Sequence, residues 1–241
     1  IGGGTAPRGT AGNAQADSNR RRRQSSSRHF VMDFQQLYGR LFTAGAASDA
    51  MLVWDLASER LAARLPLHTT VAPTALCARP ARDEVALVGF ADGSVRCFDP
   101  RTGAAPVCIS RPHSKAVVRV AAEPGRAHGG HVVSASAAGD ISLWDVRNTD
   151  AGPLCRIAAH QSAMTAAAVH PHAPLLATAS ASAHIKVFDL KGEQLSCIRY
   201  TNSFLGSRIT SVGCLAFHPY GGVLVTGSLD GAVSVYSSNT A

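Results

Sequence analysis

An aromatic residue recurs at nearly constant spacing along this chain, and this repeat constrains the fold more than any other feature. The aromatic residue lies within MLVWD (51–55), VRCFD (95–99), ISLWD (141–145), IKVFD (185–189) and VSVYS (233–237). The successive spacings between these aromatic positions are 44, 46, 44 and 48 residues. Periods of this length are typical of proteins assembled from repeated structural units. The sequence therefore predicts five similar units placed one after another.

Each unit repeats the same order of short β-rich segments and turns. In the fourth unit MTAAAVHP is followed by PLLATAS and HIKVFD, and in the fifth VGCLAFHP is followed by GVLVTGS and AVSVYS. Pro171, Gly221 and similar turn residues separate the segments, and another short segment follows every aromatic strand except the last. This predicts an all-β chain of 19 strands, with four in each unit and three in the last. The pattern resembles WD repeats, which form the blades of a β-propeller.

The middle strand of each unit is apolar without alternation, as in the run Val223, Leu224 and Val225. Strands that are covered on both faces have this pattern. We therefore expect the blades to stack face to face, with a neighbouring blade on each side, including the last one.

In a well-formed WD repeat, a histidine, a serine or threonine, an aspartate and the tryptophan form one hydrogen-bonded group. The third unit offers His113, Ser136 and Trp144, and the fourth offers His160 and Ser180. The residues at the expected aspartate positions are Asp92, Ala138, Ser182 and Asp230. Phenylalanine or tyrosine replaces the tryptophan at Phe98, Phe188 and Tyr236. We expect no unit to form the complete group.

The net charge of +7 is concentrated at one end of the chain. Residues 1–28 contain six arginines and one aspartate, whereas the remaining residues contain 17 basic and 15 acidic side chains. The repeats are therefore nearly neutral, and nucleic acid is not an expected partner. Residues 1–29 are predicted to be a disordered basic Arg/Ser linker, and residues 30–241 a partial WD-repeat propeller from a longer chain.

The segment NRRRRQSSSR (19–28) places serines close behind an arginine run. Basophilic kinases accept serines in this position, so we expect phosphorylation of Ser25 or Ser26. A phosphate would add about −1.5 to −2 charge beside the arginines. Phosphosite mapping of the intact protein from growing cells tests this prediction, and unmodified serines would contradict it.

Motifs for catalysis or cofactor binding do not stand out, and we expect no enzymatic activity, no cofactor and no small-molecule substrate. The histidine pairs HGGH (128–131) and HPH (170–172) lack the cysteine or carboxylate that would complete a metal site. Six widely spaced cysteines are expected to be reduced. The chain has no run of about 18 apolar residues and no signal-peptide core, so we expect neither membrane insertion nor secretion.

Several longer segments go beyond a general WD repeat and are similar to the C-terminal propeller of the raptor family, the regulatory scaffold subunits of TOR complex 1. These are residues 89–101, 111–120, 132–147, 168–180, 185–200 and 203–220. The most specific is the lengthened connection IRYTNSFLGSRIT before the last unit. The resemblance spans residues 40–237 and implies five blades of a ring of about seven. It also implies a non-catalytic adaptor that binds the TOR kinase complex in nutrient and growth signalling, in the cytoplasm or at endomembrane surfaces through partners.

A second hypothesis rests on Trp144-Asp145-Val146-Arg147, which resembles the WDxR ending of propellers that serve as substrate receptors of cullin-based ubiquitin ligases. Phe98-Asp99-Pro100-Arg101 is similar to it. In either case binding is expected on turns held by a rigid ring. The predicted partner-binding residues are Asp92, Arg101, Asp140, Arg147 and Asp230.

Overall fold

A computed structural model describes residues 30–78, 85–102, 106, 108–123, 131–148, 151–199 and 211–238 of the protein. Within these residues it contains 19 strands and one short 3-10 helix, η1 (Gln36–Tyr38). The strands form four sheets of four strands and one of three. In chain order we call them blade 1 (β1–β4), blade 2 (β5–β8), blade 3 (β9–β12), blade 4 (β13–β16) and blade 5 (β17–β19). The predicted fold class and strand count are confirmed.

The strands occupy equivalent positions in each blade, and neighbours along the chain pair antiparallel. The first strands are β1 (Phe30–Gln35), β5 (Pro73–Ala78), β9 (Val117–Ala122), β13 (Met164–Val169) and β17 (Val212–Phe217). The second strands are β2 (Arg40–Gly45), β6 (Ala86–Phe90), β10 (His131–Ser136), β14 (Leu175–Ser180) and β18 (Val223–Ser228). The third strands are β3 (Ala50–Asp55), β7 (Val95–Phe98), β11 (Asp140–Asp145), β15 (His184–Asp189) and β19 (Val233–Ser237). The fourth strands are β4 (Arg60–Pro66), β8 (Cys108–Ser110), β12 (Cys155–Ala158) and β16 (Gln194–Arg199).

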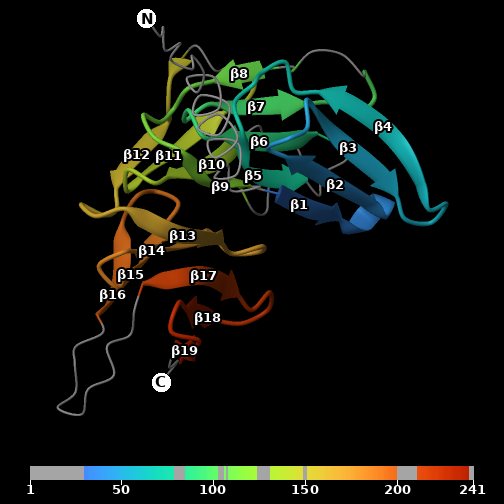
Figure 1. Ribbon diagram of the computed structural model, residues 1–241. Helices are drawn as coiled ribbons and strands as arrows, with labels where there is room; N and C mark the ends of the chain where they lie inside the picture. Colours follow the sequence, from blue (N-terminus) through green and yellow to red (C-terminus); the bar gives the residue numbers. More distant parts are fainter. Residues whose placement is uncertain are drawn as a thin grey trace, which may run out of the picture.

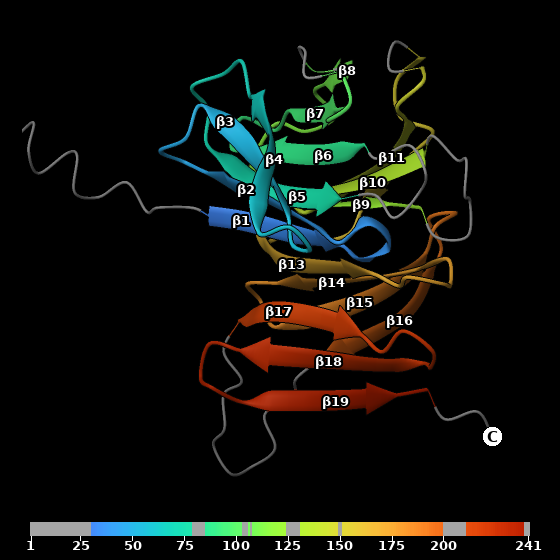
Figure 2. The same ribbon diagram turned by 90° about the vertical axis from the view of Figure 1, so that its right-hand side faces the viewer.

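The blades follow one another around an arc that begins with blade 1, in blue, and ends with blade 5, in red (Figure 1). First strands of consecutive blades pack against each other, from β1 and β5 to β13 and β17. The side view in Figure 2 shows the strands of blades 4 and 5 running across the molecule in successive layers. First strands therefore line the inside of the arc, as in a propeller.

The cores lie between blades, because the middle strands are covered on both faces. Every residue of β6 is buried, and only the first residue of β10 and of β14 is partly exposed. Phe42 of blade 1 packs in one cluster with Phe90 and Phe98 of blade 2. The predicted face-to-face stacking is confirmed for these blades.

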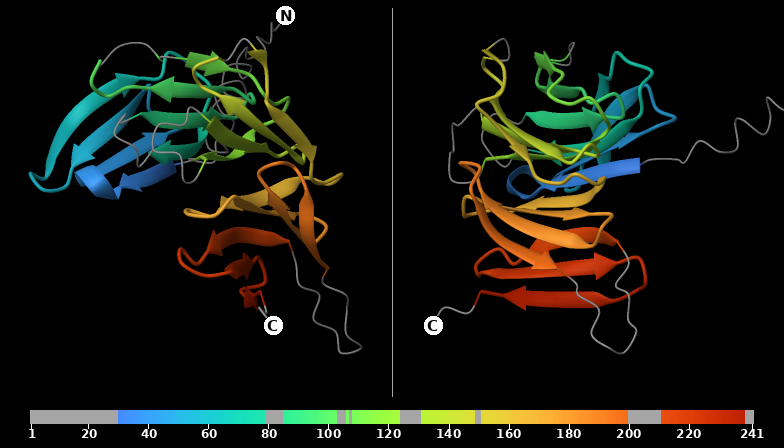
Figure 3. Two further views of the ribbon diagram at one scale, coloured as in Figure 1. Left: turned by 180° about the vertical axis from the view of Figure 1, so that it is seen from behind. Right: turned by 90° about the vertical axis from the view of Figure 1, so that its left-hand side faces the viewer.

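The two ends of the arc differ from its middle. In blade 5, Val233 and Val235 are 69% and 65% exposed, and in blade 1, Phe30 and Met32 are 60% and 61% exposed. Both blades lie at the ends of the series in the two views of Figure 3. The expected neighbour on the outer face of the last blade does not occur among the described residues, so this cover stays a prediction.

Threonine side chains connect neighbouring blades at equivalent positions. Thr74 Oγ1 donates to the carbonyl oxygen of Val117 at 2.7 Å, and Thr165 Oγ1 donates to that of Val212 at 2.6 Å. Each threonine lies where the first strand shifts register against the second, between Pro73 and Ala75 or between Met164 and Ala166. The bulge thus directs a hydroxyl across the interface.

We expect Thr165→Val to lower the free energy of opening between blades 4 and 5 by about 1 kcal/mol, because it removes one hydrogen bond with little change of shape. Hydrogen exchange of peptides from β13 and β17 in the full-length protein measures this change. Thr70→Val is the matched control, since Thr70 is exposed and has no hydrogen bond through its side chain in the described residues. Equal exchange in the two variants would contradict the role of Thr165.

Candidate functional site

The most extensive polar network among the described residues lies in blade 3. His113, on the loop before β9, places Nδ1 2.6 Å from Asp140 Oδ2 and Nε2 2.8 Å from Ser134 Oγ. Trp144 Nε1 donates to the same Ser134 oxygen at 3.0 Å. Ser136 Oγ donates to the other oxygen of Asp140. The network therefore ties the loop before β9 to β10 and β11.

The bonds fit a neutral His113. Ser134 Oγ accepts from Trp144 and lies closer to His113 Nε2, at 2.8 Å, than to the carbonyl oxygen of Ser142, at 3.5 Å. Its proton is therefore assigned to His113 Nε2, and Nδ1–H donates to Asp140. Burial is the largest influence and lowers the pKa of His113, whose side chain is fully buried, although Asp140 opposes this shift. Burial raises the pKa of Asp140, but the bonds from Ser136 and His113 outweigh it and lower that pKa below its usual value. A neutral histidine and an ionised aspartate fit these bonds.

This network corrects three sequence expectations. Blade 3 contains a complete group, although none was expected, because its aspartate is Asp140 and its serine is Ser134. The sequence pattern predicted the aspartate position at Ala138, two residues before Asp140. It predicted the serine at Ser136, two residues after Ser134. Ser136 instead supports Asp140.

The other blades retain only parts of the network. In blade 1, Trp54 Nε1 donates to Thr43 Oγ1 at 3.4 Å. In blade 4, His160 Nε2 lies 2.9 Å from Thr178 Oγ1, so Thr178 and not Ser180 is its hydroxyl partner. His184 begins β15 as Asp140 begins β11, so it occupies the aspartate position that was assigned to Ser182.

Asp92 and Asp230 stabilise their own turns and do not pair with a histidine. Asp92 Oδ1 accepts from the backbone N–H and the hydroxyl of Ser94, while Oδ2 forms a 2.9 Å ion pair with Arg111. Hydrogen bonds from Ser94 and the charge of Arg111 outweigh burial and lower the pKa of Asp92. Asp230 Oδ1 accepts from the backbone of Ala232 at 3.0 Å. Both aspartates lie two residues before the position equivalent to Asp140.

Arg101 and Arg147 lie at the opposite end of the third strands from these aspartates. The guanidinium of Arg101 binds both oxygens of Asp99, which lowers the pKa of that aspartate. Arg147 is exposed, and its backbone N–H donates to Asp145 Oδ1 at 2.9 Å. The five predicted contact residues are therefore divided between two ends of the blades.

Some sequence predictions fall outside the described residues. These are the linker at 1–29 with Ser25 and Ser26, most of the connection at 200–210, and His128. His131, the other histidine of HGGH, pairs with Glu123 at 2.6 Å. Within the described ranges no cluster of three or more metal-ligating side chains occurs.

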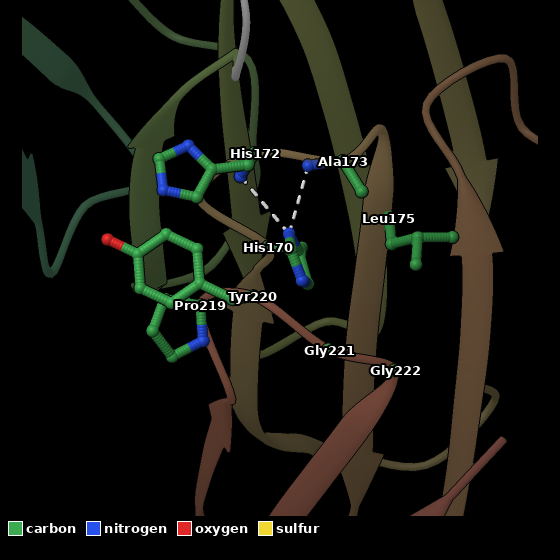
Figure 4. A pocket seen from close by; sticks show the side chains of 8 residues that line it. All are labelled: His170, His172, Ala173, Leu175, Pro219, Tyr220, Gly221 and Gly222. Atoms are coloured by element: carbon green, nitrogen blue, oxygen red, sulfur yellow. Dashed lines mark hydrogen bonds between the residues drawn. The ribbon is translucent and has the colours of Figure 1, made fainter.

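A pocket of about 450 Å³ lies between blades 4 and 5, where β13 turns into β14 and β17 turns into β18 (Figure 4). It is lined by His170, His172, Ala173, Leu175, Pro219, Tyr220, Gly221 and Gly222. His172 stacks on Tyr220 with ring centroids 5.5 Å apart. Sequence reasoning did not find this pocket, and its only signal was the His-Pro pair that recurs in both turns.

The paired histidines at these turns have the structural role that the sequence indicated. His170 Nδ1 accepts from the backbone N–H groups of His172 and Ala173, at 3.1 and 2.9 Å. His218 Nδ1 accepts from that of Tyr220 at 3.2 Å. Each histidine therefore closes the turn that follows its strand.

We expect blade 4 to lose stability as the pH falls from about 6.5 to about 4. Burial lowers the pKa of His160 to about 4, and electrostatic interactions with Lys186 and His184 lower it as well. An unfolded histidine titrates near pH 6.5, so below that pH the unfolded chain binds more protons than the folded one. Hydrogen exchange of β13–β16 peptides, corrected for intrinsic pH dependence, measures the loss. His160→Gln should reduce it, and an unchanged pH profile would contradict this role of His160.

Comparisons with known proteins agree with the blades. The family model "WD domain, G-beta repeat" matches residues 152–189 and 199–237. The crystal structure of raptor from Chaetomium thermophilum superimposes with a TM-score of 0.77 at 29% identity, covering 87% of this chain and 20% of that chain. The fold, the blade 3 network and these similarities define the class of protein as a WD-repeat β-propeller.

Sequence relatives identify the family within this class. "Regulatory-associated protein of TOR 1" of Arabidopsis thaliana is 45% identical over 86% of this chain and 15% of its own length. "Target of rapamycin complex 1 subunit mip1" of Schizosaccharomyces pombe is 31% identical over 86% and 16%, respectively. The chain belongs to the raptor family, and its repeats are similar to the WD-repeat region of those proteins. It spans 15–16% of the length of these two relatives.

Proposed function

We propose that this chain is a protein-interaction propeller in a scaffold subunit of TOR complex 1, and that it acts in nutrient and growth signalling through surface contacts. The observation that carries the proposal is its similarity to subunits of that complex over most of the chain. Its architecture suits the role, because buried blades hold exposed turns in fixed positions. The TOR kinase complex is the proposed partner, in the cytoplasm or at endomembrane surfaces.

The proposed role is non-catalytic, as is usual for scaffold subunits. The ionised side chains support this view, because Asp55, Asp92, Asp99 and Asp140 all accept local hydrogen bonds that lower their pKa. Such carboxylates stay ionised near neutral pH and are poor proton donors. In the described part of the chain, no helix is long and apolar enough to cross a membrane.

The exposed faces of blades 1 and 5 support a larger propeller. Phe30 and Met32 of β1 and Val233 and Val235 of β19 are each at least 60% exposed. Apolar groups in such numbers on sheet faces are typical of surfaces that other parts of a protein cover. We therefore extend the proposal to residues 30–241 as part of a ring that further blades of the same protein complete.

The ubiquitin-ligase hypothesis is not favoured. Trp144 of the WDxR motif is buried and bonded to Ser134, and Asp145 accepts from the backbone of Arg147. Contacts within the blade thus account for most of the motif, and the two relatives described above are named a regulatory-associated protein of TOR and a subunit of TOR complex 1.

Affinity purification of the tagged full-length protein, followed by mass spectrometry, tests the proposed function. TOR kinase should be recovered in near-stoichiometric amounts, without a cullin adaptor. Recovery of the ligase adaptor without TOR kinase would contradict the proposal.

A further inference from the structure

Blade 4 reproduces the histidine–hydroxyl pair of blade 3 but has no carboxylate beside it. His160 Nε2 lies 2.9 Å from Thr178 Oγ1, as His113 Nε2 lies 2.8 Å from Ser134 Oγ in blade 3. His113 also binds Asp140 through Nδ1, whereas Nδ1 of His160 has no hydrogen bond within the described residues. The described part of the same framework therefore lacks a carboxylate in blade 4.

The groups described around His160 are hydroxyls, an imidazole and an ammonium, without a carboxylate. His184, at the position of Asp140, places Nδ1 3.0 Å from Ser182 Oγ. The Ser182 oxygen also lies 2.9 Å from Ser162 Oγ and 2.9 Å from Ser180 Oγ. Three hydroxyls thus converge beside His184.

Lys186 adds a permanent positive charge to this cluster. Its Nζ donates to the carbonyl oxygen of Ala159 at 2.7 Å, which fixes the ammonium group next to His160. The low pKa of His160 follows in part from Lys186 and His184, so the two histidines and the lysine share one electrostatic environment. In blade 3 the position equivalent to His184 holds Asp140, which supplies a negative charge.

The cluster is accessible from solvent. Ser182 is exposed, on the turn that joins β14 and β15, and Ser162 and His184 are partly exposed. Ala183 on this turn has φ of 58°, in the left-handed region where Gly139 lies in blade 3 with φ of 95°. The turn therefore has a left-handed residue at the same place as the turn before Asp140 in blade 3. In blade 4 it carries the hydroxyl of Ser182 and the imidazole of His184 where blade 3 has the carboxylate of Asp140.

We propose that the cluster of His160, Ser162, Ser182, His184 and Lys186 binds an oxyanion carried by a partner peptide. The anion would be an aspartate or glutamate carboxylate, or a phosphorylated side chain. It would accept from hydroxyl and imidazole donors and supply the negative charge that Asp140 supplies in blade 3. The site follows from contacts within the blade and does not depend on which complex the protein joins.

The test uses the full-length protein and three immobilised peptide libraries with random flanking positions. The fixed central residue is aspartate, phosphoserine or asparagine, so the libraries separate carboxylate from phosphate and both from a neutral amide. Either acidic library should retain the protein at least about tenfold better than the asparagine library, as expected for charge-assisted hydrogen bonds. Equal retention on all three would overturn the proposal.

Two variants make the test specific for blade 4. His184→Asp supplies the carboxylate internally and should abolish the preference, while Ser182→Ala should weaken it about tenfold. His68→Asp changes the net charge equally, at an exposed position in the loop before blade 2. The His68→Asp variant should keep the preference for the acidic libraries. Loss of this preference in His68→Asp would show that net charge alone causes the binding and would overturn the proposal. Hydrogen exchange shows whether blade 4 is folded in His184→Asp. If this variant is unfolded, Ser182→Ala decides the test, and an unchanged preference in Ser182→Ala overturns the proposal.

Discussion

Gly139→Ala is expected to destabilise the junction between blades 3 and 4 by about 2–5 kcal/mol. Gly139 has φ of 95°, where a side chain costs about 1–2 kcal/mol. A Cβ there would also overlap the backbone carbonyl of His160. Gly139 O accepts from the N–H groups of Ala159 and His160, both at 3.0 Å, so the two segments cannot separate without losing these bonds. Overpacking of this kind costs about 1–3 kcal/mol more.

Hydrogen exchange of peptides around residues 139 and 160 in the full-length protein measures this effect. Exchange should accelerate by roughly thirtyfold or more, at about tenfold for each 1.4 kcal/mol. Gly152→Ala is the matched control, because Gly152 has φ of 77° but no described atom within 4 Å of an added Cβ. Its cost should be limited to about 1–2 kcal/mol. Similar effects in the two variants would refute the close approach of the blades at Gly139.

Asp140→Ala is expected to cost about 2–4 kcal/mol, because it leaves the fully buried side chain of His113 without its Nδ1 acceptor. Exchange should accelerate in β9, β10 and β11, which the network connects. Asp230→Ala is the control, since that carboxylate is exposed and accepts one backbone hydrogen bond. Its effect should be below about 1 kcal/mol. Equal effects of the two substitutions would contradict the network.

The network also predicts a pH dependence with a definite sign. The pKa values of Asp140 and His113 are both lowered in the folded protein. Their contributions are therefore present above the ordinary aspartate and histidine values, near 3.9 and 6.5, and are lost as the pH falls through the lowered values. Asp140→Ala should remove the aspartate part of this loss, below about pH 3.9, but should enlarge the histidine part, below about pH 6.5, because Asp140 opposes the lowering of the pKa of His113.

The fold could be predicted from sequence because the repeat carries most of its information. The spacing of the aromatic residues and the turns between apolar segments defined all 19 strands, and the blades have the predicted order. Burial of β6, β10 and β14 on both faces follows from their continuous apolar sequences. These features are local to each unit.

The network could not be located from sequence because it depends on a loop from outside the sheet. Ser134 and Ser136 lie two residues apart on one strand, so both point to the same face. His113 binds the serine that lies closer to it. The sequence of the strand does not show where the loop places His113. The same displacement of two residues separates Ala138 from Asp140. The pocket at Tyr220 was missed for a related reason, since two turns from different blades form it.

Cross-linking mass spectrometry of the purified endogenous complex tests the central claim that this propeller works by surface contact within a TOR complex. Lys115, before β9, and Lys191, between β15 and β16, are both exposed and lie at opposite ends of the blades. We predict cross-links from at least one of these lysines to TOR kinase or to another subunit of its complex. Cross-links from both lysines only to a cullin adaptor, in a complex without TOR kinase, would contradict the claim.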